Sequence, residues 1–226
     1  MTYKTFFLAL TLLLIAPFGY GQDDLPDGFV RVKTLIPDLD VELRYYGTDN
    51  FVGDTIDGYH SNTLILTRVA AEQLKLVQQE LRKKNLSLRV YDGYRPQRAV
   101  NHFMRWAKTL NDTVNKSKFY PNVQKKHLFK EEYIASRSGH SRGSTLDVTI
   151  INAETGEPLD MGSVYDFFGE QSWVDYRGIS KAQKTNRQLL QNIMAKYNFK
   201  NYPKEWWHFT LRGEPFPTTY FDFPIN

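Results

Sequence analysis

Two segments of the chain carry residues that can bind a metal ion. His140 lies in a glycine-flanked turn, residues 139–143, and Asp147 follows seven residues later in a strand-like stretch. A turn that runs into a strand can direct two side chains toward one point, and imidazole with carboxylate suits Zn²⁺. Taken alone the pair is a weak signal, because a His and an Asp occur at this spacing often by chance.

The second segment is Glu205-Trp206-Trp207-His208. His208 offers a third ligand, and a catalytic zinc takes three protein ligands and keeps one position open for water. A nearby Glu can accept a proton from that water and pass it to the leaving amine. Residues 205 and 208 of a regular strand face opposite sides, so we expect Glu205 on a bend after Pro203, outside the strand proper.

Arg95 stands in a third segment, Tyr91-Asp92-Gly93-Tyr94-Arg95-Pro96, in a loop after a strand. A hydrolase needs a positive donor that faces the oxyanion of the tetrahedral intermediate, and an Arg held by a rigid Pro can serve. A lone loop Arg is more often a surface residue.

A serine hydrolase is the strongest rival reading of the same residues. The stretch 139–143 matches G-x-S-x-G with Ser141 as nucleophile, and an Asp followed by His208 completes the chain order. The context is reversed, however. Residues 130–137 before the motif are charged and helix-like, whereas residues 145–150 after it are strand-like, and a nucleophile elbow needs the strand first.

Together these segments resemble the VanX-type D-alanyl-D-alanine dipeptidases, a family of zinc peptidases. The family's marks, Ser-x-His-Ser-Arg-Gly-Ser-x-x-Asp and a later Glu-Trp-Trp-His, stand unbroken at 138–147 and 205–208, and the Arg-containing loop spans 91–96. The resemblance covers about residues 35–215. Several separated motifs in the right order are far more specific than any one of them.

The resemblance implies a role for each site residue and one Zn²⁺ per chain. The implied metal ligands are His140, Asp147 and His208. The implied catalytic residues are Glu205 as general base and acid and Arg95 as the group that stabilises the transition state. The implied substrate-binding residues are Asp166 and Ser138 near the amino terminus of a small D,D-dipeptide and Tyr45 in the pocket wall. Simpler readings are a turn cap for Asp166 and core packing for Tyr45.

The chain departs from the family pattern at two positions beside the site. Gly139 stands where many relatives have Ser, and Thr145 where a small residue is common. Both changes can alter substrate affinity.

The first 22 residues are typical of a secretory signal peptide. Lys4 precedes an apolar run, residues 6–18, that is short for a membrane span, and small residues follow at Gly19 and Gly21. We therefore expect residues 1–22 to be removed, residues 23–226 to form one dipeptidase domain without a stable membrane anchor, and the enzyme to be periplasmic or secreted. That location favours turnover of peptidoglycan fragments or nutrient scavenging over antibiotic resistance.

The composition bounds the remaining function classes. The chain has 226 residues and no Cys, which excludes thiolate ligands, a Cys nucleophile and disulfides. Its 29 basic and 25 acidic residues give a mild net charge of +4, and its basic clusters have acidic neighbours, so no nucleic-acid partner is expected.

The apolar periodicity predicts the elements that position these residues. Helical spacing covers 66–84, 97–110 and 180–197, and strand patterns cover 29–36, 41–46, 86–91, 144–151 and 206–211. Residues 111–130 are polar and irregular and are predicted to form a lid or a long loop. Helices and strands do not alternate regularly, so we expect a single α+β domain with a central antiparallel sheet, helices around it and the zinc site on the sheet.

Three alternative functions stay open from the sequence. The first is a D,D- or L,D-carboxypeptidase of the same zinc architecture, which would trim longer peptidoglycan stems. The second is the serine hydrolase that uses Ser141. The third is a non-enzymatic module that binds the cell wall or zinc. The complete set of ligands, base and Arg argues against a lost activity.

Overall fold

A five-stranded sheet forms the centre of the molecule. The computed structural model describes Met1 and residues 25–226. The strand order is β2-β4-β5-β7-β6. The strands are β2 (Asp40–Val41), β4 (Leu86–Asp92), β5 (Thr145–Asn152), β7 (Glu205–Leu211) and β6 (Phe199–Tyr202). β5 is buried along almost its whole length because it lies in the middle of the sheet with covered faces.

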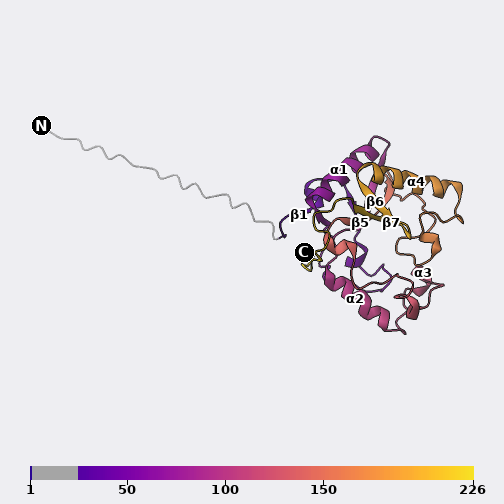
Figure 1. Cartoon of the computed structure of the whole chain (residues 1–226). Coiled ribbons are helices and arrows are strands. Elements are labelled where there is room, and N and C mark those ends of the chain that lie inside the picture. The colour runs from indigo at the N-terminus through magenta and orange to yellow at the C-terminus, as the bar shows by residue number, and fades with distance from the viewer. Residues whose placement is uncertain (2–24) are drawn as a thin grey trace.

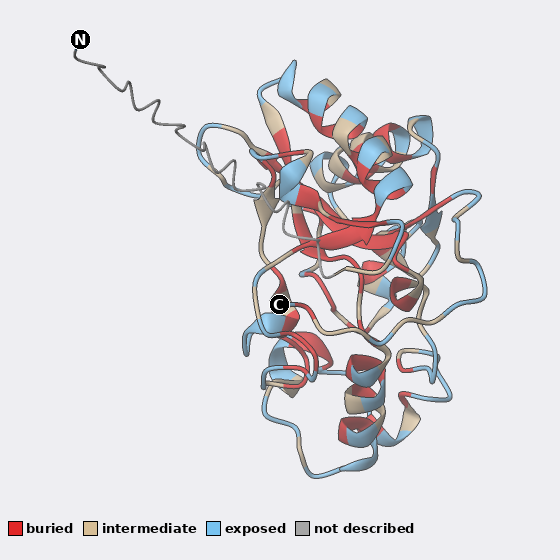
Figure 2. Cartoon of the chain, turned by 90° about the vertical axis from the view of Figure 1, so that its left-hand side faces the viewer, coloured by how far each residue is buried: buried red, intermediate tan, exposed pale blue. Residues whose placement is uncertain are grey.

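Helices lie on both sides of this sheet. Figure 1 shows α1 (Arg68–Arg82) and α4 (Lys181–Lys196) above it, and α2 (Gln97–Lys108) and the short α3 (Lys116–Phe119) below it. Figure 2 shows that the sheet and the inward faces of the helices are buried while the outer helix faces are exposed. Burial of these apolar faces is the main favourable contribution to folding.

The predicted fold class is confirmed, with one addition. The pairs β4–β5, β5–β7 and β6–β7 are antiparallel, as expected, whereas the short edge strand β2 runs parallel to β4. The three long predicted helices are present with ends within three residues of the expected positions. β6 was not predicted, because its two middle residues are exposed and give no apolar alternation.

Two predicted strands near the N-terminus are mostly turns. Residues 29–36 form only the short β1 (Phe29–Arg31), which pairs with β3 (Ile65–Thr67), and then a 3-10 turn. Residues 41–46 leave the sheet after Val41 and form a 3-10 turn at Arg44–Tyr46. This turn buries the Tyr45 side chain and leaves Tyr46 exposed, an arrangement that resembles strand alternation in the sequence.

The predicted lid at 111–130 is instead packed against the end of α2. Within it lie α3 and a 3-10 turn at Lys125–His127. The ammonium group of Lys125 donates hydrogen bonds to the carbonyl oxygens of Thr109 and Asp112, at 2.8 and 2.6 Å. The segment is therefore a fixed part of the lower layer.

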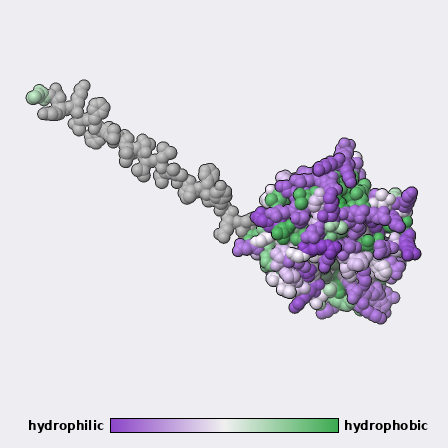
Figure 3. Space-filling model, turned by 45° about the horizontal axis from the view of Figure 1, so that its top comes forward, coloured by the Kyte–Doolittle hydropathy of each residue, from purple (hydrophilic) through white to green (hydrophobic). Residues whose placement is uncertain are grey.

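The surface carries hydrophilic and apolar residues side by side. Figure 3 shows a face that is mostly hydrophilic, with apolar residues in small groups. No described helix combines the length and the hydropathy needed to cross a membrane. The predicted signal peptide lies outside the described residues except for Met1, so the division at residue 22 stays a prediction.

A buried arginine fixes the loop between β5 and α4. Arg187 of α4 is 2% exposed and donates three hydrogen bonds of 2.6 Å to the carbonyl oxygens of Met161, Gln171 and Trp173. Burial lowers the pKa of Arg187 to about 10, which leaves the guanidinium charged at neutral pH. Because the loop contains Asp166, the position of a predicted site residue depends on this contact.

We expect Arg187→Met to lower the free energy of unfolding by about 3 kcal/mol or more, because three buried carbonyl groups lose their donor. Chemical denaturation of the variant and the wild type measures this difference. Arg177→Met, an exposed arginine of the same loop, is the matched control and should change stability by less than about 0.5 kcal/mol. Equal effects of the two substitutions would contradict the role given to Arg187.

Candidate metal centre and active site

Neighbouring strands bring three polar side chains to one level of the sheet. Asp92 at the end of β4 pairs with Asp147 of β5, and Asp147 pairs with His208 of β7. Side chains of directly paired residues lie about 4.5–5.5 Å apart at their β-carbons. A register shift between Val90 and Asp92 places Asp92 on this level.

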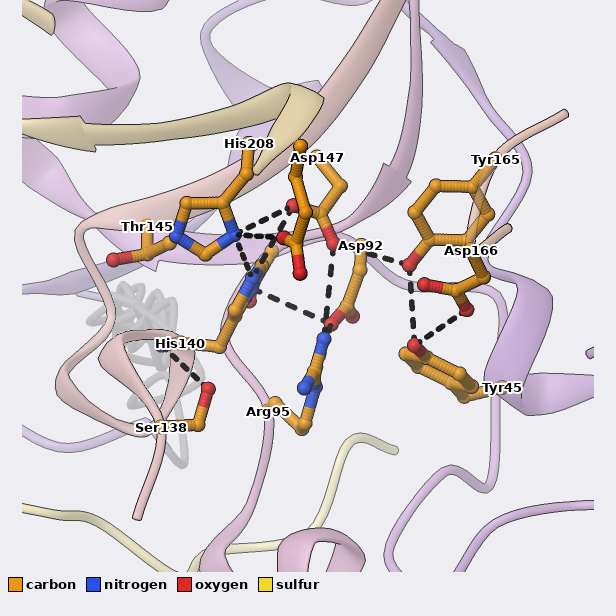
Figure 4. A network of polar contacts seen from close by, with 12 residues as sticks. Tyr45, Asp92, Arg95, Ser138, His140, Thr145, Asp147, Tyr165, Asp166 and His208 are labelled. Carbon is orange, nitrogen blue, oxygen red and sulfur yellow. Dashed lines mark hydrogen bonds and ion pairs between the residues drawn. The ribbon is translucent and has the colours of Figure 1, made fainter. Parts of the chain in front are cut away.

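His140 reaches the same point from the turn that precedes β5. The turn is a 3-10 helix, Gly139–Arg142, and the Ser138 hydroxyl accepts a hydrogen bond from the His140 backbone N–H at 3.3 Å. The imidazole Nδ1 lies 2.8 Å from the Gly93 carbonyl oxygen. If Nδ1 donates its proton there, the other nitrogen, Nε2, is left as a free ligand atom. Figure 4 shows His140, Asp147 and His208 pointing toward one another.

The three converging atoms have the spacing of a metal's ligand set. His140 Nε2 lies 3.3 Å from both Asp147 Oδ1 and His208 Nδ1, and the last two lie 3.1 Å apart. Zinc bonds of about 2.0–2.1 Å in a tetrahedron imply ligand atoms about 3.3 Å apart. Asp147 Oδ1 is buried and accepts no hydrogen bond within the described part of the chain. These residues therefore fit a divalent ion with nitrogen and oxygen ligands.

Glu205 stands beside this ligand set, but in a strand and not on a bend. It is the first residue of β7 and pairs with Tyr202 of β6 across a tight turn. A register shift between Asn201 and Tyr202 interrupts the ladder there, and such irregularities increase the local twist. Consequently, Glu205 and His208 face the same cavity despite their spacing, and Glu205 Oε2 lies 3.2 Å from His208 Nδ1.

Arg95 is held beside the ligand set by a residue that the sequence analysis did not single out. Asp92 is fully buried, and its Oδ2 accepts hydrogen bonds from Arg95 Nε at 2.9 Å and lies 2.8 Å from Nη2. The guanidinium also lies over the rings of Tyr45 and Phe103, at 4.9 and 5.3 Å from their centroids. Its Nη2 is 3.7 Å from Asp147. Asp92 and the two rings therefore fix the direction of the Arg95 donors.

Asp166 contacts Tyr45, the residue whose ring lies against Arg95. The Tyr45 hydroxyl donates to Asp166 Oδ2 at 2.7 Å, and the Tyr165 hydroxyl donates to Asp147 at 3.0 Å (Figure 4). Asp166 has a φ of 59°, an unusual conformation for a residue other than Gly that is frequent at functional sites. Its side chain accepts a tyrosine hydrogen bond, which does not fit the alternative of a turn cap.

Burial and charge shift the pKa values of these acids in opposite directions. Burial would raise the pKa of Asp147, but the two imidazoles more than offset this and lower it. Burial, and then the negative charge of Asp147, raise the pKa of Asp166 well above its usual value. An added positive charge near Asp166 would therefore be favourable.

The serine nucleophile of the rival reading is inaccessible. Ser141 is fully buried, and its hydroxyl has no hydrogen-bond partner within the described residues. It does not line the cavity into which His140 and His208 face. The geometry therefore does not support a serine hydrolase.

All eight predicted site residues border one cavity of about 340 Å³. They are Tyr45, Arg95, Ser138, His140, Asp147, Asp166, Glu205 and His208. This volume lies at the small end of the roughly 300–1,000 Å³ range of small-molecule sites. The segment over the cavity is 132–139, and among the described residues none of the predicted lid at 111–130 lines it.

Sequence reasoning missed Asp92 and Tyr165, although Asp92 stands within the quoted Arg95 motif.

Comparison with known proteins agrees with this geometry. The peptidase family described as D-ala-D-ala dipeptidase matches residues 26–226. The chain belongs to this family. Its members are metallopeptidases, so three residues that could bind a metal ion are expected in an enzyme of this kind.

Individual relatives carry the same name. The chain is 39% identical to a D-alanyl-D-alanine dipeptidase of Enterococcus faecalis over 89% of this chain and 100% of the relative. It is 41% identical to one from Streptomyces coelicolor over 87% of this chain and 98% of that protein. A third, from Escherichia coli, is 32% identical over 80% and 83% of the two chains.

We expect the purified protein to bind one divalent ion per chain and His140→Ala to lose it on dialysis, because a ligand is removed. Elemental analysis measures the bound metal, and a rise in melting temperature on adding metal reports binding independently. His60→Ala, an exposed histidine outside the cavity, is the control and should keep the ion. Full metal content in His140→Ala would contradict the ligand assignment.

Proposed function

We propose that the protein hydrolyses D-Ala-D-Ala to two molecules of D-alanine with the help of one zinc ion. The observation that carries the proposal is that three possible metal ligands lie around one small cavity together with other charged groups. These are Glu205, Arg95 and the carboxyl group of Asp166, which can accept a hydrogen bond from an ammonium group. The names of the relatives support the choice of substrate.

His140, Asp147 and His208 would hold the zinc ion. When bound, zinc lowers the pKa of a water molecule toward neutrality and polarises a carbonyl group. Two neutral imidazoles and one carboxylate match the donor sets of catalytic zinc sites, although Co²⁺ and Mn²⁺ accept similar ligands. Gly93, through its carbonyl, orients the His140 ring.

Glu205 would move the proton in the reaction. Its carboxylate lies 3.2 Å from His208 and borders the cavity, so it can reach an attacking water molecule. It accepts the proton as the water attacks the peptide carbonyl and returns it to the amine of the departing D-alanine. Arg95, fixed by Asp92, supplies the positive donor toward the oxyanion that forms on the carbonyl oxygen.

Asp166 would recognise the free amino terminus of the dipeptide. A substrate ammonium group supplies the positive charge that its buried carboxyl favours. Tyr45 keeps that carboxyl in place through the 2.7 Å hydrogen bond. Ser138 borders the cavity as well, but its hydroxyl also caps the turn that carries His140. We therefore assign Ser138 a contact near the substrate and a part in placing His140.

The alternative is a carboxypeptidase of the same zinc architecture that acts on longer peptides. The small cavity and the carboxyl that fits a free ammonium group favour the dipeptide. We further propose that the enzyme works in the periplasm or outside the cell on peptidoglycan fragments, because residues 1–22 have the pattern of a signal peptide. Fractionation of the host and mass determination of the mature N-terminus test that location.

The substrate is tested by measuring the release of free alanine, of either configuration, by the purified protein. We expect release from D-Ala-D-Ala, and none from L-Ala-L-Ala or N-acetyl-D-Ala-D-Ala. Preferential release from a pentapeptide that ends in D-Ala-D-Ala would move the assignment to a carboxypeptidase.

We expect Glu205→Gln to lower kcat by about 10²–10⁴-fold, because proton transfer is lost while the ligands stay in place. Steady-state kinetics measures the loss, and elemental analysis should still find one metal ion per chain. Glu154→Gln, an exposed acid of the turn after β5, is the control and should keep wild-type activity. If Glu205→Gln retained more than a tenth of the wild-type kcat, another group would be the base.

We expect Asp166→Asn to raise the KM for D-Ala-D-Ala by about 10–100-fold, the range for loss of a charged hydrogen bond. The change in kcat should be smaller, because the ammonium group is remote from the reacting carbonyl. Asp175→Asn, an exposed residue of the same loop, should leave KM unchanged. A fall in kcat with an unchanged KM would place Asp166 in the chemical step instead.

A further inference from the structure

A second cavity lies next to the active-site cavity. Its volume is about 480 Å³, and it shares three lining residues with the first, Tyr133, Phe168 and Lys204. These three side chains therefore lie between the two cavities. We call these three residues, together with Glu132, the partition.

Two contacts hold the partition closed. The rings of Tyr133 and Phe168 are stacked with centroids 4.9 Å apart and an angle of 16° between their planes. Next to them, Lys204 Nζ lies 2.6 Å from Glu132 Oε2. The first contact joins the segment over the cavity to the Asp166 loop, and the second joins it to the turn before Glu205. The partition thus ties together three segments that border the site.

The two sides of the partition differ in how firmly they are fixed. Phe168 is buried and packs against the rings of Phe51 and Tyr120, and its N–H donates to the Phe119 carbonyl oxygen at 2.7 Å. On the opposite side Tyr133 is only partly buried, and Glu132 is exposed with a left-handed φ of 66°. Surface ion pairs contribute little free energy. Tyr133 and Glu132 are therefore the side that can be removed without loss of the core.

The partition and Asp166 line the same cavity. Phe168 is two residues after Asp166, the proposed acceptor of the substrate's ammonium group. With the substrate's ammonium group at Asp166, we place the partition behind the amino terminus of the bound dipeptide. Any residue that extends the peptide in that direction would have to pass through it.

We propose that Tyr133 and the Glu132–Lys204 ion pair restrict the enzyme to dipeptides, and that the second cavity is a subsite for the amino-terminal extension of a longer peptide once they are removed. This inference rests on the proposed function, because it takes Asp166 as the ammonium site. Exclusion by a wall is a common way to build specificity against a longer competitor.

The lining of the second cavity indicates which extensions fit. Beyond the shared residues it contains the acids Glu131 and Glu170, the amide of Gln171 and the rings of Trp173 and Tyr176. Carboxylates favour an amine, and aromatic rings favour the aliphatic stem or the cation of such a side chain. A peptide whose residue before D-Ala-D-Ala carries a side-chain amine is therefore the preferred longer substrate.

The test compares kcat/KM for L-Lys-D-Ala-D-Ala with kcat/KM for D-Ala-D-Ala in the full-length protein. We divide the value for the tripeptide by the value for the dipeptide. We expect Tyr133→Ala to raise this ratio by about tenfold or more, the scale on which steric exclusion in a pocket acts. Tyr133→Phe keeps the ring stack and should keep the wild-type ratio. Tyr176→Ala is the matched control and should keep the wild-type ratio. Tyr176 lines the second cavity but does not belong to the partition.

Metal content and melting temperature establish that each variant is folded. If Tyr133→Ala does not fold, Glu132→Gln at the exposed end of the partition decides, and its ratio should rise by about threefold or more. An unchanged ratio in a folded variant, or a wild type that cleaves the tripeptide as well as the dipeptide, would overturn the inference. A wild type that does not cleave D-Ala-D-Ala would instead refute the proposed function.

Discussion

Two carboxyl groups buried side by side in the sheet, Asp92 and Asp147, determine much of the rest of the site. Buried acids are costly unless positive or hydrogen-bonding groups surround them. Arg95 meets this need for Asp92, and His140 and His208 meet it for Asp147. The sheet register, the capped turn before β5 and the loop after β4 all place these partners. The same electrostatic requirement that the fold must satisfy thus prepares a place for a divalent ion.

Support for the site comes from regions far from the ligand atoms. Arg187 of α4 holds the loop that presents Asp166, and the irregular β6–β7 hairpin turns Glu205 toward His208. Tyr45 connects the two halves, because its ring lies against Arg95 and its hydroxyl bonds to Asp166. Preorganised donors and acceptors of this kind do not have to rearrange when charge develops during a reaction.

The sequence predicted the parts of the site that local patterns encode. Strong apolar periodicity located α1, α2 and α4, and the motifs around His140 and His208 pointed to three side chains that the fold brings together. Contacts between distant segments could not be predicted from the sequence. Asp92 lies close to His140 because β4 pairs with β5, and Tyr165 reaches Asp147 from a loop. The strand predicted over residues 41–46 was wrong, because a turn that buries Tyr45 and exposes Tyr46 gives the same alternation of apolar and polar positions as a strand. For residues 111–130 the lid was wrong and the long loop was right, because polarity alone does not distinguish a lid from a packed loop.

The central claim is that one zinc ion held by His140, Asp147 and His208 enables this chain to cleave D-Ala-D-Ala. The most direct measurement is a titration of zinc into metal-free protein while D-alanine release is recorded. We expect no release without metal, then a linear rise in rate that ends at one zinc ion per chain. Full release from the metal-free protein, or a break at two ions per chain, would contradict it.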